Sequence, residues 1–224
     1  MRIPAELHSG YTYFRNGRYV VEADRYRAVA AGQAPKTMII ACADSRVDPA
    51  TIFAAAPGEL FVVRNVAALV PPCETCESSG TYHGTSAALE FAVTQLKVEE
   101  IVVMGHGMCG GITAALQAAE HRPVGRFIGP WMEQIAGVRD DLIERTPGMF
   151  PEFRQKALER IAIQHSLGNL NSFPFVNEQV NRGKLRLHGA WFSISQGELH
   201  WLDQDTGVFE TVSVGLPDRD QGLR

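Results

Sequence analysis

The sequence has no excess of basic residues. Its 21 Lys and Arg are outnumbered by 25 Asp and Glu, the net charge is −4, and the basic residues are scattered along the chain. Binding to a phosphate backbone needs a block or a helical face of positive charge. We therefore expect no nucleic-acid partner and no large polyanionic substrate.

Long hydrophobic runs are also missing. The apolar runs are far too short to span a bilayer, and residues 1–10 lack the charged start and apolar middle of a secretion signal. We therefore expect a cytoplasmic protein with no membrane partner. Cysteine is scarce as well, because four cysteines in 224 residues do not form a disulfide scaffold. In a reducing compartment, cysteines serve metal binding, catalysis or packing.

The apolar segments that are present predict an α/β fold. Residues 37–41 and 60–63 are apolar on both faces, as in a parallel sheet that helices cover. Helices are predicted over residues 85–98 and 112–120, with a strand at 100–104 between them. This alternation favours right-handed crossovers and a mostly parallel central sheet flanked by helices.

The second half of the sequence predicts more helix and a hairpin. These elements are two helices and two strands, at residues 131–145, 151–180, 184–194 and 198–202. We expect an interruption of the second helix near Gly168 and Pro174, where helix-breaking residues occur.

We find no internal repeat and no linker, so we expect a single domain over residues 1–224. Its expected parts are a helical N-terminal arm, an α/β core and a tail, at residues 1–35, 36–215 and 216–224. The arm has scattered aromatic residues but no core of its own, so we expect it to pack on a partner subunit. We interpret residues 71–84, rich in Ser, Thr and Gly, as an insertion that shields the site.

Two segments that end predicted strands carry the chemistry. They read Cys42-Ala43-Asp44-Ser45-Arg46 and His106-Gly107-Met108-Cys109-Gly110-Gly111. Sites in parallel α/β sheets form at the carboxyl ends of strands, so segments far apart in sequence can meet there. Two thiolates, an imidazole and a carboxylate suit zinc, and the neighbouring glycines allow a tight turn around the ion. Isolated residues of these types are more often ordinary core residues, but their coincidence at two strand ends favours a metal site.

Asp44 and Arg46 form a second constellation. Two positions apart on an extended segment, their side chains point to the same side, so the guanidinium can hold the carboxylate ionised and oriented. A structural ion pair is the alternative. We favour a functional pair, because a carboxylate beside zinc either ligates the metal or accepts a proton from its water.

These segments resemble the β-class carbonic anhydrases, in which Cys-x-Asp-x-Arg and His-x-x-Cys-Gly-Gly form the zinc site. The likeness extends over most of the chain and includes residues 32–36, 57–67, 166–170 and 183–185. It implies one Zn²⁺ per chain and reversible hydration of carbon dioxide to bicarbonate and a proton by zinc-bound hydroxide. It also implies a homodimer or a tetramer of dimers, with the pocket at the subunit interface.

The resemblance assigns roles to individual residues. The implied zinc ligands are Cys42, His106 and Cys109, with water or Asp44 in the fourth place, and the implied catalytic dyad is Asp44 and Arg46. The implied substrate-binding residues are of three kinds. Gln33 would supply an amide to the site of a neighbouring subunit, and Gly110 would supply a backbone donor. The implied apolar pocket residues are Phe61, Val66 and Phe91.

Two departures from the family pattern affect the site. Phe91 stands where the plant-like branch usually has a tyrosine, so a pocket hydroxyl is missing. A second branch lets the aspartate ligate zinc, helped by bicarbonate bound between a Trp, an Arg and a Tyr; the corresponding residues here are Ile39, Arg64 and Phe192. Because two of these three contacts are absent, we predict that Asp44 stays off the metal and pairs with Arg46 near neutral pH.

Two alternatives to carbonic anhydrase activity remain open from the sequence. One is a hydrolase of carbon disulfide or carbonyl sulfide on the same scaffold, because sites rather than folds decide the substrate. The other is a non-catalytic zinc-thiolate redox sensor, to which Cys73 and Cys76 would contribute.

Overall fold

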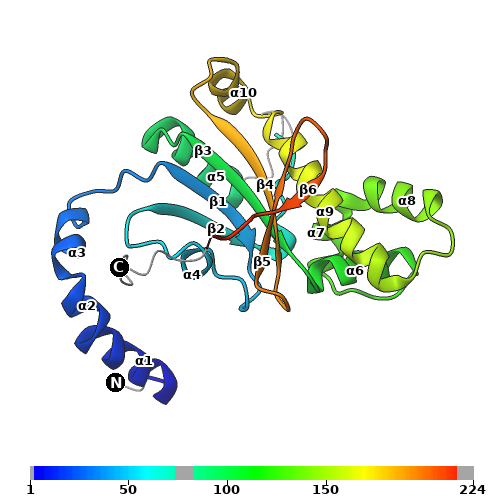
Figure 1. The fold of residues 1–224 in the computed structure, drawn as a ribbon. Coiled ribbons are helices and arrows are strands. Elements are labelled where there is room, and N and C mark those ends of the chain that lie inside the picture. Colours follow the sequence, from blue (N-terminus) through cyan, green and yellow to red (C-terminus); the bar gives the residue numbers. More distant parts are fainter. Residues whose placement is uncertain (1–2, 74–82, 216–224) are drawn as a thin grey trace.

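A six-stranded mixed sheet forms the centre of the protein (Figure 1). The computed structural model describes residues 3–73 and 83–215. Along the sheet the strands follow the order β2-β1-β3-β4-β5-β6. Their bounds are Thr37–Cys42 (β1), Leu60–Asn65 (β2), Glu100–His106 (β3), Arg186–Ser193 (β4), Glu198–Leu202 (β5) and Phe209–Thr211 (β6). The fold is therefore the α/β class that the sequence predicts.

Strands β1 to β4 are parallel, and this arrangement brings the two motifs together. In β1 and β3, Ile40 lies opposite Val103 and Ala41 lies opposite Met104, so both strands end at the same edge. Nearly every residue of these two strands is buried, because the apolar side chains face covered surfaces on both sides of the sheet. Cys42 and His106 are the last residues of their strands and meet at this carboxyl edge.

Helices flank the sheet, and most of the long ones lie near its carboxyl edge (Figure 1). In the core the helices are α4 (Pro49–Ile52), α5 (Gly84–Glu90), α6 (Gly110–Ala119), α7 (Ile128–Met132), α8 (Ala136–Arg145), α9 (Pro151–Leu170) and α10 (Pro174–Asn181). Short helical turns add η1 (Val66–Ala68), η2 (Phe91–Leu96) and η3 (Glu133–Ile135). Helix α9 packs on β3 and β4 and so lies beneath the edge where the motifs meet.

Three N-terminal helices extend away from the sheet (Figure 1). They are α1 (Ala5–Asn16), α2 (Arg18–Val21) and α3 (Ala23–Val29). Within the described chain, none of their residues is buried, although Phe14, Tyr19 and Tyr26 contact one another with ring centroids 5.2 to 5.9 Å apart. The segment is helical and has no core of its own, as the sequence predicts.

Several sequence-based elements need correction. The helix predicted at 131–145 is divided into α7, η3 and α8, and α7 already begins at Ile128. Helix α9 continues through Gly168, because one glycine costs a helix only about 1 kcal/mol and nothing crowds this position. The break comes before Pro174, which begins α10. The predicted helix at 85–98 changes to π-helical hydrogen bonding in η2 and ends before a left-handed Lys97. Strand β6 is not predicted by its short, polar-flanked sequence.

Some predictions fall outside the described residues, namely the tail at 216–224 and most of the insertion at 71–84, including Cys76. Among the residues that are described, no helix is long and apolar enough to cross a membrane.

Candidate metal centre

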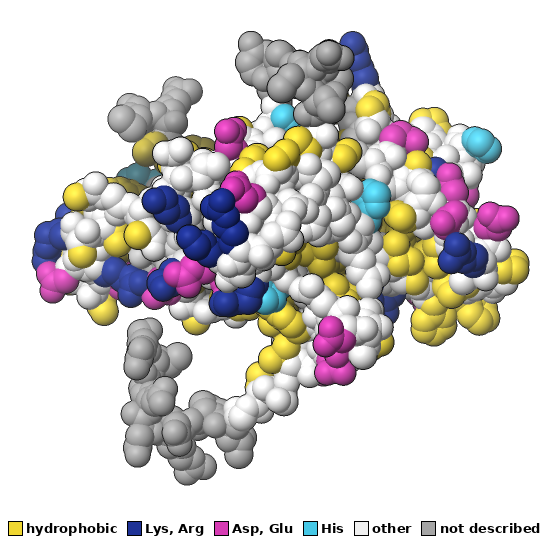
Figure 2. Space-filling view, turned by 90° about the horizontal axis from the view of Figure 1, so that it is seen from above, with side chains coloured by type: hydrophobic (Ala, Val, Ile, Leu, Met, Phe, Trp, Pro, Cys, Tyr) yellow, Lys and Arg dark blue, Asp and Glu magenta, His cyan; other side chains and the backbone are white. Residues whose placement is uncertain are grey.

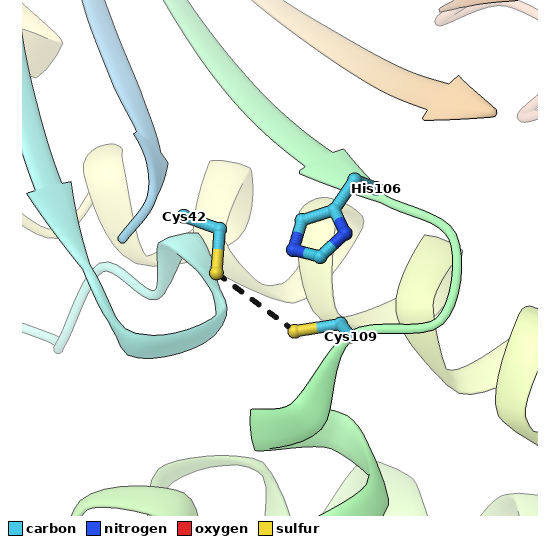
Figure 3. A group of neighbouring side chains, drawn as sticks. All are labelled: Cys42, His106 and Cys109. Atoms are coloured by element: carbon cyan, nitrogen blue, oxygen red, sulfur yellow. Dashed lines mark hydrogen bonds between the residues drawn. The ribbon is translucent and has the colours of Figure 1, made fainter. Parts of the chain in front are cut away.

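Three side chains meet at the carboxyl edge of the sheet, and Figure 3 shows them facing one another. Cys42 ends β1, His106 ends β3, and Cys109 is the residue immediately before α6. All three are buried, at 5%, 1% and 3% exposure. Their ligand atoms lie within 4.8 Å of one another, and the two sulfurs are 3.9 Å apart. One ion can reach all three atoms from the space between them.

The hydrogen bonding of His106 suits a metal ligand. Its Nδ1 lies 2.9 Å from the carbonyl oxygen of Gly107, and because a carbonyl only accepts, Nδ1 carries the proton. Nε2 of the neutral ring then has a free lone pair. This atom is buried and has no hydrogen-bond partner among the described residues. Such an atom costs free energy unless it binds something, so the donor set fits a zinc ion.

The two thiols have very different acidities. A hydrogen bond from the Cys109 thiol lowers the pKa of Cys42 to about 4, against the effect of burial. The same hydrogen bond, together with burial, raises the pKa of Cys109. One sulfur is therefore a thiolate at neutral pH, the form that binds zinc, and metal binding must displace the proton of the other.

Asp44 lies beside this group but pairs with Arg46. The Nε of Arg46 donates to Oδ1 at 2.9 Å and its Nη2 donates to Oδ2 at 2.7 Å, and the backbone N–H of Arg46 also donates to Oδ1 at 3.0 Å. Hydrogen bonding from Arg46 outweighs desolvation and holds the pKa of Asp44 well below its usual range. Oδ2 is 3.9 Å from Nε2 of His106, so an ionised carboxylate borders the metal centre.

The turn between His106 and α6 is held by hydrogen bonds at several points. The amide of Gly107 donates to the Phe192 carbonyl at 2.9 Å, and Nη2 of Arg46 donates to the Met108 carbonyl at 3.2 Å. The left-handed residue of this turn is Met108, at φ 58°. Gly111 is needed for a different reason, since a Cβ there would lie 2.7 Å from Cγ1 of Val66.

A family model described as carbonic anhydrase matches residues 37–199, which include the whole metal centre. β carbonic anhydrase 5 (chloroplastic) and β carbonic anhydrase 3, both of Arabidopsis thaliana, are each 35% identical to this chain. The first match covers 84% of this chain and 61% of that relative, and the second covers 89% and 76%. The chain belongs to the β-class carbonic anhydrases.

Solved carbonic anhydrase structures agree with this assignment. The β-carbonic anhydrase CcaA has a TM-score of 0.86 and 28% identity, with 92% of this chain and 98% of that chain covered. One of two tetrameric β-carbonic anhydrases of the ascomycete Sordaria macrospora has a TM-score of 0.78 and 28% identity, with 88% and 95% covered. Zinc is the cofactor of this family, and the group of Cys42, His106 and Cys109 is able to hold it.

The predicted pocket residues are only partly brought to the metal centre. Val66 directly follows β2 and Gly110 begins α6, so both lie near the carboxyl edge. Phe61 pairs with Met38, four residues before Cys42 and so ~13 Å along the strand. Phe61 contacts Phe91, which is 45% exposed, with ring centroids 5.9 Å apart. Gln33 is exposed in the segment before β1.

The residues at the bicarbonate positions of the second branch have other partners here. Ile39 is buried in the sheet between Val62 and Val102. The guanidinium of Arg64 donates to the carbonyl of Cys42 at 2.9 Å and to the carbonyl of Asp44 at 2.5 Å. Arg64 thus braces the backbone of the first motif.

Sequence reasoning missed Glu159, whose carboxylate lies beneath the turn that carries Cys109. The signal was present, because Glu159 stands on the helix face that also carries Leu158, Ala162 and Ile163, which are buried. A charged residue on an apolar helix face needs a partner.

Proposed function

We propose that this chain catalyses the reversible hydration of carbon dioxide to bicarbonate and a proton, with zinc held by Cys42, His106 and Cys109. The observation that carries the proposal is a buried nitrogen and two sulfurs converging beside an ionised carboxylate. Because the chain spans 61% of the length of the chloroplastic relative, the activity of that relative supports this proposal without deciding it.

When bound, zinc supplies Lewis acidity that lowers the pKa of a water molecule toward neutrality. Asp44 accepts a hydrogen bond from the attacking water and so aims its lone pair at the carbon of carbon dioxide. Arg46 keeps the carboxylate ionised, and its two-pronged contact fixes the orientation of both oxygens. We assign Asp44 and Arg46 to the reaction as a dyad on this basis.

The start of α6 is suited to the anionic product. The first N–H groups of a helix have no acceptor within the helix and carry partial positive charge. Gly110 is the first residue of α6, is exposed, and follows Cys109 directly. We assign its backbone N–H to bicarbonate.

A second copy of the chain would complete the pocket. Gln33, Phe61 and Phe91 lie away from the metal centre of their own chain and are exposed or half-buried, so they are able to serve a neighbour. The arm exposes Leu7 (66%), Tyr11 (62%) and Tyr13 (81%), and Figure 2 shows exposed hydrophobic side chains among charges of both signs. The Sordaria relatives are tetrameric, which supports a homodimer or a tetramer of dimers here.

Stopped-flow assays with carbon dioxide, carbonyl sulfide and carbon disulfide test the proposal against the hydrolase alternative. We expect zinc-loaded protein to hydrate carbon dioxide fastest, and Cys42→Ser to lose zinc and activity together. Faster turnover of either sulfur-containing gas would contradict the proposal. If treatment with an oxidant leaves the hydration rate of zinc-loaded protein unchanged, this result counts against the redox-sensor alternative.

The cytoplasmic location stays a prediction. Two of the Arabidopsis relatives are named as chloroplastic and mitochondrial proteins, so relatives of this chain occur in more than one compartment.

A further inference from the structure

Glu159 is a buried acid whose three hydrogen bonds all come from nitrogen donors. It is 3% exposed and lies on α9 beneath the turn between β3 and α6. Its Oε1 accepts from the backbone N–H of Cys109 at 3.1 Å and from Nε2 of Gln155 at 3.2 Å. Its Oε2 accepts from the indole Nε1 of Trp191 at 3.0 Å.

The amide of Cys109 needs this acceptor. Cys109 precedes the first turn of α6, so its N–H points away from the helix and finds no carbonyl there. Its neighbour Met108 is left-handed, which makes the turn costly to hold. Nη2 of Arg46 donates to the carbonyl of Met108, and the carbonyl of Phe192 accepts from the amide of Gly107. Thr113 donates to the carbonyl of Cys109, and Glu159 accepts from the N–H of Cys109.

We propose that Glu159 is a positioning residue for the zinc ligand Cys109. By fixing the Cys109 backbone, it keeps the sulfur 3.9 Å from Sγ of Cys42 and within reach of one ion. The inference rests on the proposed function, because it takes Cys42, His106 and Cys109 as the zinc ligands. Groups that hydrogen-bond to the surroundings of metal ligands commonly orient them in this way.

The donor pattern explains why this residue is a carboxylate. Cys109 and Trp191 donate to different oxygens, so both ends of the group must accept. A glutamine has one oxygen and one NH₂, and it would turn the NH₂ toward one of these two N–H donors. In Glu159→Gln, either Cys109 or Trp191 therefore loses its acceptor.

A double-mutant cycle follows from this conflict. Replacing Trp191 with phenylalanine removes the donor at Oε2, so that a glutamine at 159 is free to present its oxygen to Cys109. We therefore expect Trp191→Phe to restore zinc binding to Glu159→Gln. Two merely structural changes would instead add their destabilisation.

The experiment measures zinc affinity by competition with a chromogenic chelator for wild type, E159Q, W191F and the double variant. We expect E159Q to bind zinc at least about tenfold more weakly, and the double variant to come within about threefold of W191F. The exposed Glu152, on the same helix, supplies the control, because E152Q should keep wild-type affinity. Wild-type affinity in E159Q, or equal losses in E159Q and the double variant, would overturn the proposal.

Cobalt substitution supplies a second readout that folding stability alone does not move. We expect the thiolate-to-cobalt charge-transfer band to weaken in E159Q and to recover in the double variant. If E159Q does not fold, the comparison of W191F with the double variant still decides, since a tenfold loss of zinc affinity there contradicts the proposal. A zinc-loaded wild type without hydration activity would refute the proposed function and leave this result unaffected.

Discussion

In the proposed reaction, Asp44 is the residue whose partner decides whether the metal centre is open to water. Its carboxylate takes three hydrogen bonds from Arg46 and lies 3.9 Å from Nε2 of His106, so it stands between the guanidinium and the metal centre. Paired with Arg46, it would leave a zinc ion held by Cys42, His106 and Cys109 free to bind a water molecule. Ile39 and Phe192 stand where the second branch of the family has the Trp and Tyr that bind bicarbonate. Because Ile and Phe cannot make these hydrogen bonds, we expect Asp44 to stay paired with Arg46.

Asp44→Asn tests the orienting role at the residue scale. The amide is nearly isosteric but uncharged, so we expect near-stoichiometric zinc and a loss of about 100-fold or more in kcat/KM for hydration. Metal analysis and stopped-flow kinetics on the same sample give both quantities. Ser45→Ala, between the two dyad residues and exposed, should leave the rate unchanged. An Asp44→Asn variant with wild-type kcat/KM would contradict the role.

The candidate ligands are readable from the sequence because their types are rare and their positions end apolar runs. Cys42, His106 and Cys109 meet as the strand ends predict. Met108 and Glu159 are not readable in this way. A positive φ at Met108 depends on how the turn must lead into α6, and the partner of Glu159 comes from a segment fifty residues away.

At the scale of elements, α6 packs closely against η1. This close approach determines which glycine at the start of α6 can be replaced by a larger residue. A Cβ at Gly111 would lie 2.7 Å from Cγ1 of Val66 and 3.0 Å from Cβ of Ala67, whereas a Cβ at Gly110 would meet nothing within 4 Å. Packing against η1 therefore requires a glycine at position 111 but not at position 110.

Gly111→Ala should therefore destabilise the protein by about 1 to 3 kcal/mol through overpacking. Gly110→Ala is the matched control and should leave stability unchanged or raise it by up to about 1 kcal/mol, because alanine is the better helix former. Urea unfolding midpoints measure both. Equal losses in the two variants would show that the contact with Val66 does not matter.

An ion cluster joins the amino ends of β3 and β4, opposite the metal centre. Glu100 accepts hydrogen bonds from Arg186 and from Nε2 of His188, the latter at 2.7 Å. Burial alone would raise the pKa of Glu100, but these bonds outweigh it and hold that pKa below its ordinary value of 4.5.

Because the folded pKa of Glu100 is depressed, its contribution to stability is present above pH 4.5 and is lost as pH falls through the folded value. We expect Glu100→Gln to lower the free energy of unfolding by about 0.5 to 1 kcal/mol near pH 6. The difference from wild type should shrink below pH 4.5. Urea unfolding of both proteins at each pH checks this, and a difference that grows toward acid pH would reverse the sign.

Elements with strong patterns are predictable from the sequence, and those set by tertiary context are not. The apolar runs at 37–41 and 60–63 mark β1 and β2 to within two residues. Gly168 looks like a break but lies inside α9, where packing on β3 and β4 outweighs its low propensity. The short strand β6 forms because β5 offers it an edge, which its own sequence does not reveal.

At the scale of the whole molecule, one chain holds three of its five predicted pocket residues, Gln33, Phe61 and Phe91, away from its own metal centre. Phe61, the second residue of β2, contacts Phe91 near the amino ends of β1 and β2, and Gln33 precedes β1 at the same end. Resemblance to the family suggested their roles, but sequence alone does not say which copy of the chain they serve. An assembly of two copies with shared sites reconciles the two observations.

Mixing two inactive variants tests this sharing. Gln33→Ala should reduce kcat/KM without loss of zinc, because it removes the amide from the site of the neighbouring copy. Asp44→Asn should reduce kcat/KM without loss of zinc in the site of its own copy. If each site combines Gln33 of one copy with Asp44 of another, coexpressed variants should recover activity, up to about a quarter of wild type for a two-fold dimer. No recovery in mixed oligomers, or a fully active monomer by sedimentation, would contradict shared sites.

The central claim is that zinc held by Cys42, His106 and Cys109 makes this chain a carbon dioxide hydratase. The most direct test is to measure the hydration rate by stopped flow while zinc is titrated into metal-depleted protein. The account predicts a rate that rises in proportion to bound zinc and levels off at one ion per chain, with no such rise in Cys42→Ser. Zinc-saturated protein that hydrates carbon dioxide no faster than buffer would contradict it.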